Sequence, residues 1–288
     1  MQTVTQRDED GFRLRGLEVT RTEAFVDASF AFAMTLLVIF FNDLPDTVAE
    51  LRHALLRVPT FVLCFTLLAT FWLGHNRWSR RFGMEDAFTT VLSLAMVLVV
   101  LVFVYPLRMV ISAFLATVSM GALPSELGLD HADPAFDMQT AFIVYSLGVG
   151  ALSAILWILN RHAARHAHAL ELDARERHLL RGELGMHAIQ SGIAVLSIAT
   201  SLALLAIRPA TPWPNSIPMW LYALNAIVLP LHWTRVMRTV PDVGTAHPVP
   251  DPMPEQPSTP ALPAAADASP APASAPSPDA AHPQGGSR

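Results

Sequence analysis

The sequence predicts an all-α integral membrane protein with six transmembrane helices. Of its 288 residues, 52% are apolar and only 15% are charged, and the mean hydropathy is +0.39 despite a polar C-terminal part. This composition is typical of membrane proteins rather than of soluble domains. Six apolar stretches have close to the roughly 20 residues that a helix needs to cross a bilayer. They are residues 23–41, 55–74, 88–107, 139–159, 188–207 and 217–234.

The distribution of arginine predicts the orientation of these spans. The chain contains no lysine, and its arginines gather before the first span and after the second, fourth and sixth spans, whereas the other loops hold few. Because positively charged loops remain in the cytoplasm, both termini are expected there, in a multi-pass protein of the cell membrane. Six spans, an even number, are consistent with this orientation.

The two ends of the sequence differ in character. Residues 241–288 are rich in proline, alanine and serine and have almost no large apolar side chains, so they cannot bury enough surface to fold. They are predicted to form a disordered cytoplasmic tail. Residues 1–240 are expected to form the six-helix membrane domain.

Composition also limits the function. A net charge of -5, with the arginines in loops rather than on one face, does not suggest a nucleic-acid partner. The single cysteine, Cys64, excludes a disulfide within one chain. No cysteine and no tight set of carboxylates accompanies His162, His166 and His168, so the stretch 161–184 is interpreted as a solvated helical extension of the fourth span and not as a metal site. Neither a metal nor a cofactor is expected.

The first span carries a charge where membrane helices rarely do. Asp27 is its only charged residue from position 24 to position 41. Such a carboxylate is either a functional group or an interfacial one near the positive N-terminal end of a helix, and both interpretations are open. At about 100° per residue, Asp27 faces away from a stripe on the opposite side of the helix. That stripe consists of Phe25, Phe32, Thr35 and Ile39.

The second span offers partners for Asp27. It ends in FWLGHN, which places Trp72 and His75 near the cytoplasmic end, where Arg21 and Asp27 of the first span are also expected. Neighbouring antiparallel helices would bring these side chains into one interhelical polar network. The network would either fasten the two helices together or act as a pH-sensitive lock, because histidine titrates near neutrality.

Two motifs then resemble a known family. The pattern R-x-x-x-F-S-D on one helix and F-W-x-x-H on the next is typical of the endosomal and lysosomal transmembrane protein 175 family of potassium channels and its bacterial homologues. Here the first motif consists of Arg21, Phe25, Val26 and Asp27, and the second of Phe71, Trp72 and His75. The third span ends in LVFVYPLR (residues 101–108) and is similar to the proline-containing third helix of the family. The resemblance covers about residues 15–110.

The resemblance implies a homotetramer whose first helix lines the pore without a carbonyl selectivity filter. An apolar residue five positions after the motif aspartate forms the hydrophobic constriction, which corresponds to Phe32, and a serine or threonine three positions later contributes to selectivity, which corresponds to Thr35. Ile39 lies on the same stripe and is expected to line the pore. Potassium is then the permeant ion, and the lipid bilayer is the surrounding partner. Val26 replaces the family's serine, and Phe32 replaces its isoleucine or leucine.

Two other classes of protein are alternatives to a channel. A proton-coupled secondary transporter would use Asp27 and His75 as a proton relay. A membrane-bound enzyme would need paired carboxylates, a nucleophile elbow or a zinc motif, and the sequence offers no such set of catalytic residues.

Overall fold

The computed structural model describes residues 6–39, 46–129, 132–211 and 213–241, and these residues are all-helical apart from their connections. The side chain of Ile39 is also outside the description. The expected tail, residues 241–288, lies outside the described residues except for Pro241. The helices are α1 (Arg21–Ile39), α2 (Val48–Leu55), α3 (Val58–Phe82), α4 (Ala87–Val118), α5 (Pro134–Arg165), α6 (Ala174–Ile207), the 3₁₀ turn η1 (Trp213–Ser216), α7 (Ile217–Ala223) and α8 (Asn225–Arg238).

The described residues of each predicted span are mainly helical, and the prediction of an all-helical, multi-pass membrane protein is confirmed. Four helical stretches are long and apolar enough to cross a membrane: Val48–Phe82, Ala87–Val118, Pro134–Arg165 and Ala174–Ile207. Among the described residues, α1 and the α7–α8 stretch are not part of that set. The sixth span is divided at Leu224, where the amide of Ile227 donates to the Leu224 carbonyl at 3.0 Å, as in a 3₁₀ turn.

Acidic caps explain where the long helices begin. The side chains of Asp86, Asp133 and Asp173 each accept a hydrogen bond from a backbone amide in the first turn of α4, α5 and α6. Asp173 and Glu176 form a complete capping box. This box corrects one expectation: the stretch 161–184 is not a single helical extension, because α5 ends at Arg165 and a new helix starts at the box.

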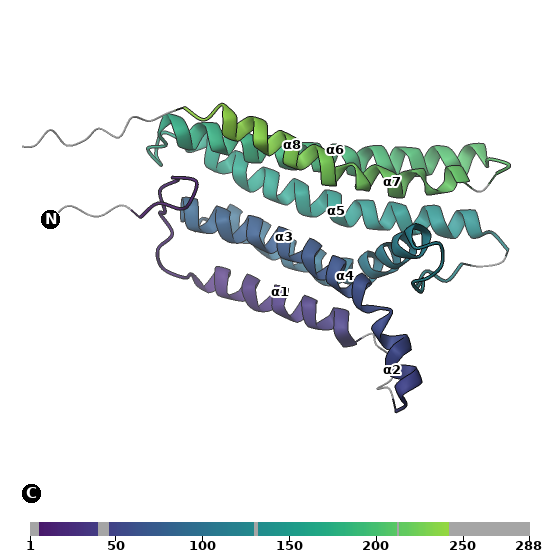
Figure 1. Cartoon of the computed structure of the whole chain (residues 1–288). Coiled ribbons are helices and arrows are strands. Elements are labelled where there is room, and N and C mark those ends of the chain that lie inside the picture. The colour runs from purple at the N-terminus through teal and green to yellow at the C-terminus, as the bar shows by residue number, and fades with distance from the viewer. Residues whose placement is uncertain (1–5, 40–45, 130–131, 212, 242–288) are drawn as a thin grey trace, which may run out of the picture. The chain divides into compact units, whose positions relative to one another are not determined.

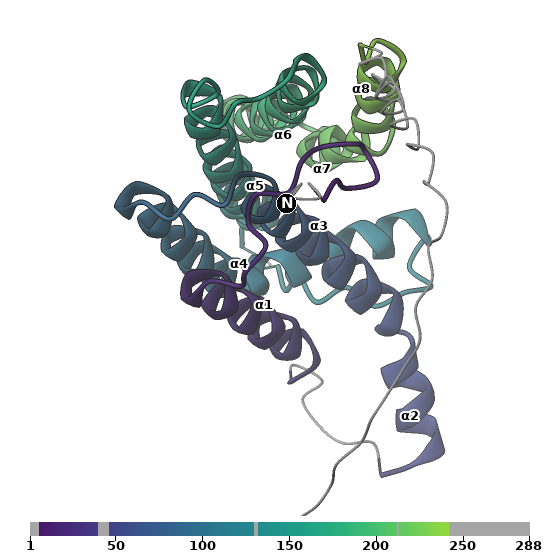
Figure 2. The same cartoon turned by 90° about the vertical axis from the view of Figure 1, so that its left-hand side faces the viewer.

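The helices lie side by side in one bundle (Figure 1). α1 packs against α4 and α3 at one side, whereas α6 and α8 pack together at the opposite side, and α5 lies between them against α4 and α6. The view along the bundle shows the same order (Figure 2). α2 projects from the end of α3 and buries none of its residues. α1 is therefore a peripheral helix of its own chain, with one side covered and the other free.

Candidate functional site

The two sides of α1 differ in burial. Val26, Phe30, Ala33 and Leu37 follow one another at intervals of three and four residues and are buried. This spacing places them on one helical face, which packs against α3 and α4. Val26, which stands where the family has serine, is fully buried in the apolar core. A hydroxyl there would need a hydrogen-bond partner inside the core, and valine needs none.

The opposite side of α1 is uncovered within this chain. Phe25 and Phe32 are 53% and 56% exposed, and Thr35 is also exposed. These are the described members of the stripe predicted from helical periodicity, and Ile39 extends it in sequence. The Thr35 hydroxyl donates to the Ala31 carbonyl at 2.9 Å, so its oxygen keeps lone pairs that can accept from, or coordinate, a ligand.

Asp27 is bonded to the second membrane helix. Trp72 Nε1 on α3 donates to Asp27 Oδ1 at 2.7 Å, and this hydrogen bond joins α1 to α3. Arg21 is exposed and makes no ion pair with Asp27 among the described residues. Of the predicted network, the structure therefore joins Asp27 with Trp72 and leaves Arg21 apart.

His75 bonds in a different direction. It is buried, and its Nε2 lies 2.9 Å from Ser93 Oγ on α4. Its Nδ1 has no hydrogen-bond partner among the described residues. The hydrogen bonds therefore do not join Arg21, Asp27 and His75 in one cluster but form two separate contacts, α1 with α3 and α3 with α4.

Glu23 anchors the N-terminal end of α1, and sequence reasoning missed it. The side chain is buried, lies 3.1 Å from Arg80 Nε, and accepts from Asn76 Nδ2 at 3.4 Å. The Glu23 amide in turn donates to Thr20 Oγ1 at 3.1 Å. The T-x-x-E spacing before the apolar run is the signal that could have identified this helix start.

The residues before α1 form a second missed feature. Residues 6–20, which we call the N-terminal strap, turn back on themselves through a bridge between Arg7 and Arg13. Phe12 at the turn is fully buried, with its ring edge-to-face against Phe82 at 5.4 Å and the Arg81 guanidinium 4.8 Å from its centre. A single aromatic residue in a charged segment was the only sequence signal of this packing.

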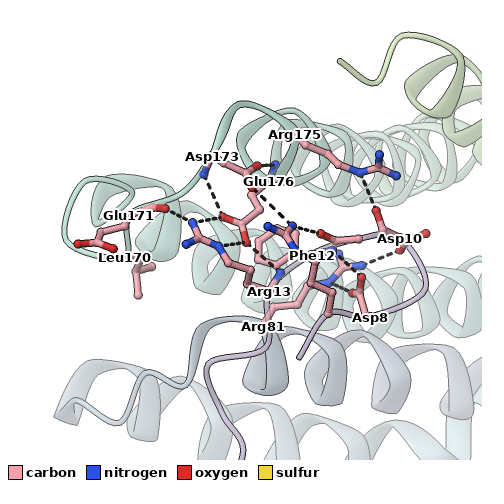
Figure 3. Close-up of polar contacts among 12 residues, drawn as sticks. Asp8, Asp10, Phe12, Arg13, Arg81, Leu170, Glu171, Asp173, Arg175 and Glu176 are labelled. Carbon is pink, nitrogen blue, oxygen red and sulfur yellow. Dashed lines mark hydrogen bonds and ion pairs between the residues drawn. The ribbon is translucent and has the colours of Figure 1, made fainter. Parts of the chain in front are cut away.

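Charged side chains fix the strap to α6 and α3 (Figure 3). The buried Glu176 carboxylate pairs with Arg13 at 3.0 Å and with Arg15 at 2.9 Å, and the hydrogen bond with Glu176 raises the pKa of Arg13 above its usual value. On α3, the buried Arg81 pairs with Asp8 at 2.8 Å, with Asp10 at 2.6 Å and with Glu183 at 3.3 Å. These contacts form the strap network: Asp8, Asp10, Arg13, Arg15, Arg81, Glu176 and Glu183.

The strap also touches the backbone of α3 closely. The amides of Arg15 and Gly16 both donate to the Arg80 carbonyl at 3.0 Å. A Cβ atom at Gly16 would lie 2.5 Å from the Ser79 carbonyl oxygen, so only glycine permits this approach. Gly83, which ends α3 with a φ of 58°, lies at the same crossing.

The histidines that follow the fourth span have structural partners. His162 Nε2 lies 2.8 Å from Asp86 Oδ2, and His166 Nδ1 donates to the His162 carbonyl at 2.9 Å. Across the described ranges, no three metal-binding side chains gather in one place. Around α1, the structure shows a free helix face and the side chains that anchor the opposite face.

Comparisons with known proteins agree with the motifs. Residues 21–106 match the family model described as endosomal/lysosomal potassium channel TMEM175. The chain is also 26% identical over 207 residues to a protein of Marivirga tractuosa named potassium channel, covering 71% of this chain and 80% of that protein. The resemblance to the TMEM175 family is confirmed. The description of this family names a potassium channel, which is not a class of enzyme.

The fold agrees as well. The chain resembles the crystal structure of the potassium channel MtTMEM175, a threonine-to-alanine variant in complex with a nanobody–MBP fusion protein, with a TM-score of 0.66 and 24% identity. The match covers 81% of this chain and 99% of that chain. The TMEM175 family match runs from the start of α1 to Pro106 in α4, and so includes both the Asp27–Trp72 and the His75–Ser93 contacts.

Proposed function

We propose that four copies of this chain assemble in the cell membrane, with both termini in the cytoplasm, around a central potassium-permeable pore lined by α1. The observation that carries this proposal is the free side of α1, where Phe25, Phe32 and Thr35 are exposed although the opposite side is tightly packed. One face of α1 is packed against its own chain, and the other is apolar, uncovered and holds one hydroxyl. Such a helix can lie between its own subunit and a central pore on a symmetry axis.

Phe32 forms the constriction in this proposal. Four phenylalanine side chains at one level make a bulkier ring than isoleucine or leucine, and such an apolar ring blocks ions by excluding water. Thr35 lies one turn further along the same side. The Thr35 hydroxyl donates its hydrogen to the Ala31 carbonyl, so its oxygen keeps lone pairs that can coordinate an ion. This coordination gives potassium a modest preference over sodium.

Passive flux tests the proposal. The purified protein in liposomes is expected to conduct potassium down its gradient, Phe32→Ala to increase the conductance several-fold, and Thr35→Ala to change the K⁺/Na⁺ permeability ratio. Phe65→Ala is the matched control, because Phe65 is exposed on α3 and distant in sequence from α1. Absence of potassium flux at several pH values and voltages contradicts the channel, and unchanged currents in both α1 variants remove α1 from the pore.

A proton-coupled transporter is not favoured. The two residues that would relay protons make separate contacts, Asp27 with Trp72 and His75 with Ser93. The two mechanisms are distinguished by imposing a pH gradient on liposomes with equal potassium on both sides. Net potassium accumulation would support a transporter, whereas a channel gives none.

A further inference from the structure

The C-terminal end of α1 lacks the positively charged side chain that stabilises helix C-termini. The last four carbonyl groups of a helix have no partner within it, and they carry partial negative charge that a nearby cation stabilises. The last turn of α1 contains no basic residue. If α1 lines a pore, its C-terminal end must be held in place. A cation that stabilises this end has to come from another part of the chain.

Arg108 supplies that group from α4. Its side chain is only 9% exposed, and its Nη1 donates to the carbonyl oxygen of Leu37, in the last turn of α1, at 3.4 Å. Leu37 is buried on the packed side of α1, so this contact forms behind the free face and leaves that face open.

Glu126 holds Arg108 in position. Arg108 Nε lies 2.5 Å from Glu126 Oε2, and Nη2 donates to Oε1 at 2.7 Å, which is a two-point contact between a guanidinium and a carboxylate. The Glu126 amide donates to Ser112 Oγ at 2.8 Å. Because Arg108 and Ser112 are four residues apart on α4, they share one helical face and bind both the side chain and the backbone of Glu126.

We propose that Arg108 is a positioning residue that fixes the C-terminal end of α1, and with it the height and rotation of Thr35 at the pore. This inference rests on the proposed function for its effect on selectivity, but not for its effect on α1 itself. Leu37 is two residues beyond Thr35, and slippage by one residue moves a helix by about 1.5 Å and 100°. A selective site requires its coordinating groups to stay within about 0.5 Å of their working positions. If the C-terminal end of α1 were not fixed, selectivity would fall before conduction was lost.

The opposite end of α1 has different anchors. Glu23 is paired with Arg80, and Asp27 accepts from Trp72. Among the described contacts, Arg108 is the charged side chain that reaches the C-terminal half of α1. Loss of Arg108 should therefore loosen the last two turns of α1 while its first turns keep their contacts.

Hydrogen exchange on the full-length protein tests the anchor without reference to conduction. Arg108→Met is expected to speed exchange of the α1 amides in residues 33–38 by about tenfold, the effect of losing a hydrogen bond to a charged group, and to leave residues 24–28 unchanged. Arg108→Lys should give an intermediate rate, because it keeps the charge and loses the two-point contact. Arg52→Met removes a positive charge from an exposed position on α2 and is the control.

The permeability ratio tests the consequence for selectivity. Arg108→Met is expected to lower the K⁺/Na⁺ ratio about twofold or more, and Arg52→Met to leave it unchanged. If Arg108→Met does not fold, Glu126→Gln replaces it, since it removes the ion pair and should raise exchange in the same residues. Unchanged exchange in the variant that folds overturns the inference. A wild-type protein without potassium flux overturns the proposed function alone, because exchange still decides whether Arg108 holds α1.

Discussion

The end of the bundle that carries the N-terminal strap and the middle of the bundle are held together by opposite kinds of contact. At the strap end, five arginine–carboxylate pairs join the strap to α3 and to the start of α6. In the middle, apolar side chains do the packing, and polar contacts between helices are hydrogen bonds such as Asp27–Trp72 and His75–Ser93. Each strap pair keeps at least one partner partly exposed to water, whereas a polar group in the apolar region requires a partner within the protein.

Two kinds of contact hold α1 in place along its length. Its beginning continues from a charged, densely bonded strap, and its packed face relies on apolar contacts. The strap end should therefore respond to changes in charge, and the middle to loss of individual donors. Four substitutions test this difference, in order of expected effect.

Phe12→Ala is expected to have the largest effect. It removes a fully buried ring from between Phe82 and Arg81 and should lower the free energy of unfolding by about 3 kcal/mol or more. Thermal unfolding in detergent and trypsin cleavage within the strap measure it. Phe136→Ala, at an exposed phenylalanine, is the control. Equal stability of the two variants would mean that the strap does not contribute to the fold.

Glu176→Gln should come next. It leaves Arg13 and Arg15 without their shared carboxylate, and because these arginines are partly exposed the expected loss is about 2 kcal/mol, less than for a fully buried pair. The melting temperature of the variant measures the loss. Glu171→Gln is the control, since Arg13 hydrogen-bonds with the backbone carbonyl of Glu171 and would lose only a longer-range charge interaction. A melting temperature like that of wild type would argue against charge as the main attachment of the strap.

Trp72→Phe tests the middle of the bundle. The ring is largely retained, but Asp27 loses its donor, which should cost about 1.5 kcal/mol and reduce the yield of assembled protein on size exclusion. Trp213→Phe, at a tryptophan that is 70% exposed, should change neither quantity. The importance of single hydrogen bonds in this region is refuted if Trp72→Phe behaves like that control.

Asp86→Ala should have the smallest effect and a defined pH dependence. Burial raises the pKa of Asp86, but hydrogen bonds from the Thr89 amide and His162 outweigh it, so the pKa is lowered from 3.8. A carboxylate with a lowered pKa stabilises the fold above its unfolded pKa and loses this contribution as the pH falls through the folded value. Wild type should therefore exceed Asp86→Ala by about 1 kcal/mol from pH 7 to pH 5, and the difference should disappear only in stronger acid.

Melting curves at several pH values check this prediction. Glu85→Ala is the control, because Glu85 is exposed and does not cap α4. A difference that is already lost between pH 7 and pH 5 would contradict the lowered pKa.

Much of the first helix was predictable from the sequence, because periodicity acts within one element. The stripe of Phe25, Phe32 and Thr35 was derived from the 100° advance of a helix, and all three side chains are exposed on one side of α1. The choice of partners was less predictable. His75 was expected near Asp27 but bonds with Ser93, since the rotation of α3 about its own axis is set by packing that periodicity does not specify.

The sequence by itself determined that this is a multi-pass, helical membrane protein that resembles the TMEM175 channels, because hydrophobic length, arginine distribution and two short motifs are local properties. Only the tertiary structure decided what holds α1: the strap network around Glu176 and Arg81, and the contact of Arg108 with Leu37. These partners are separated by 71 to 163 residues. Contacts between residues so far apart in the sequence depend on how whole helices pack, and no local sequence pattern predicts this packing.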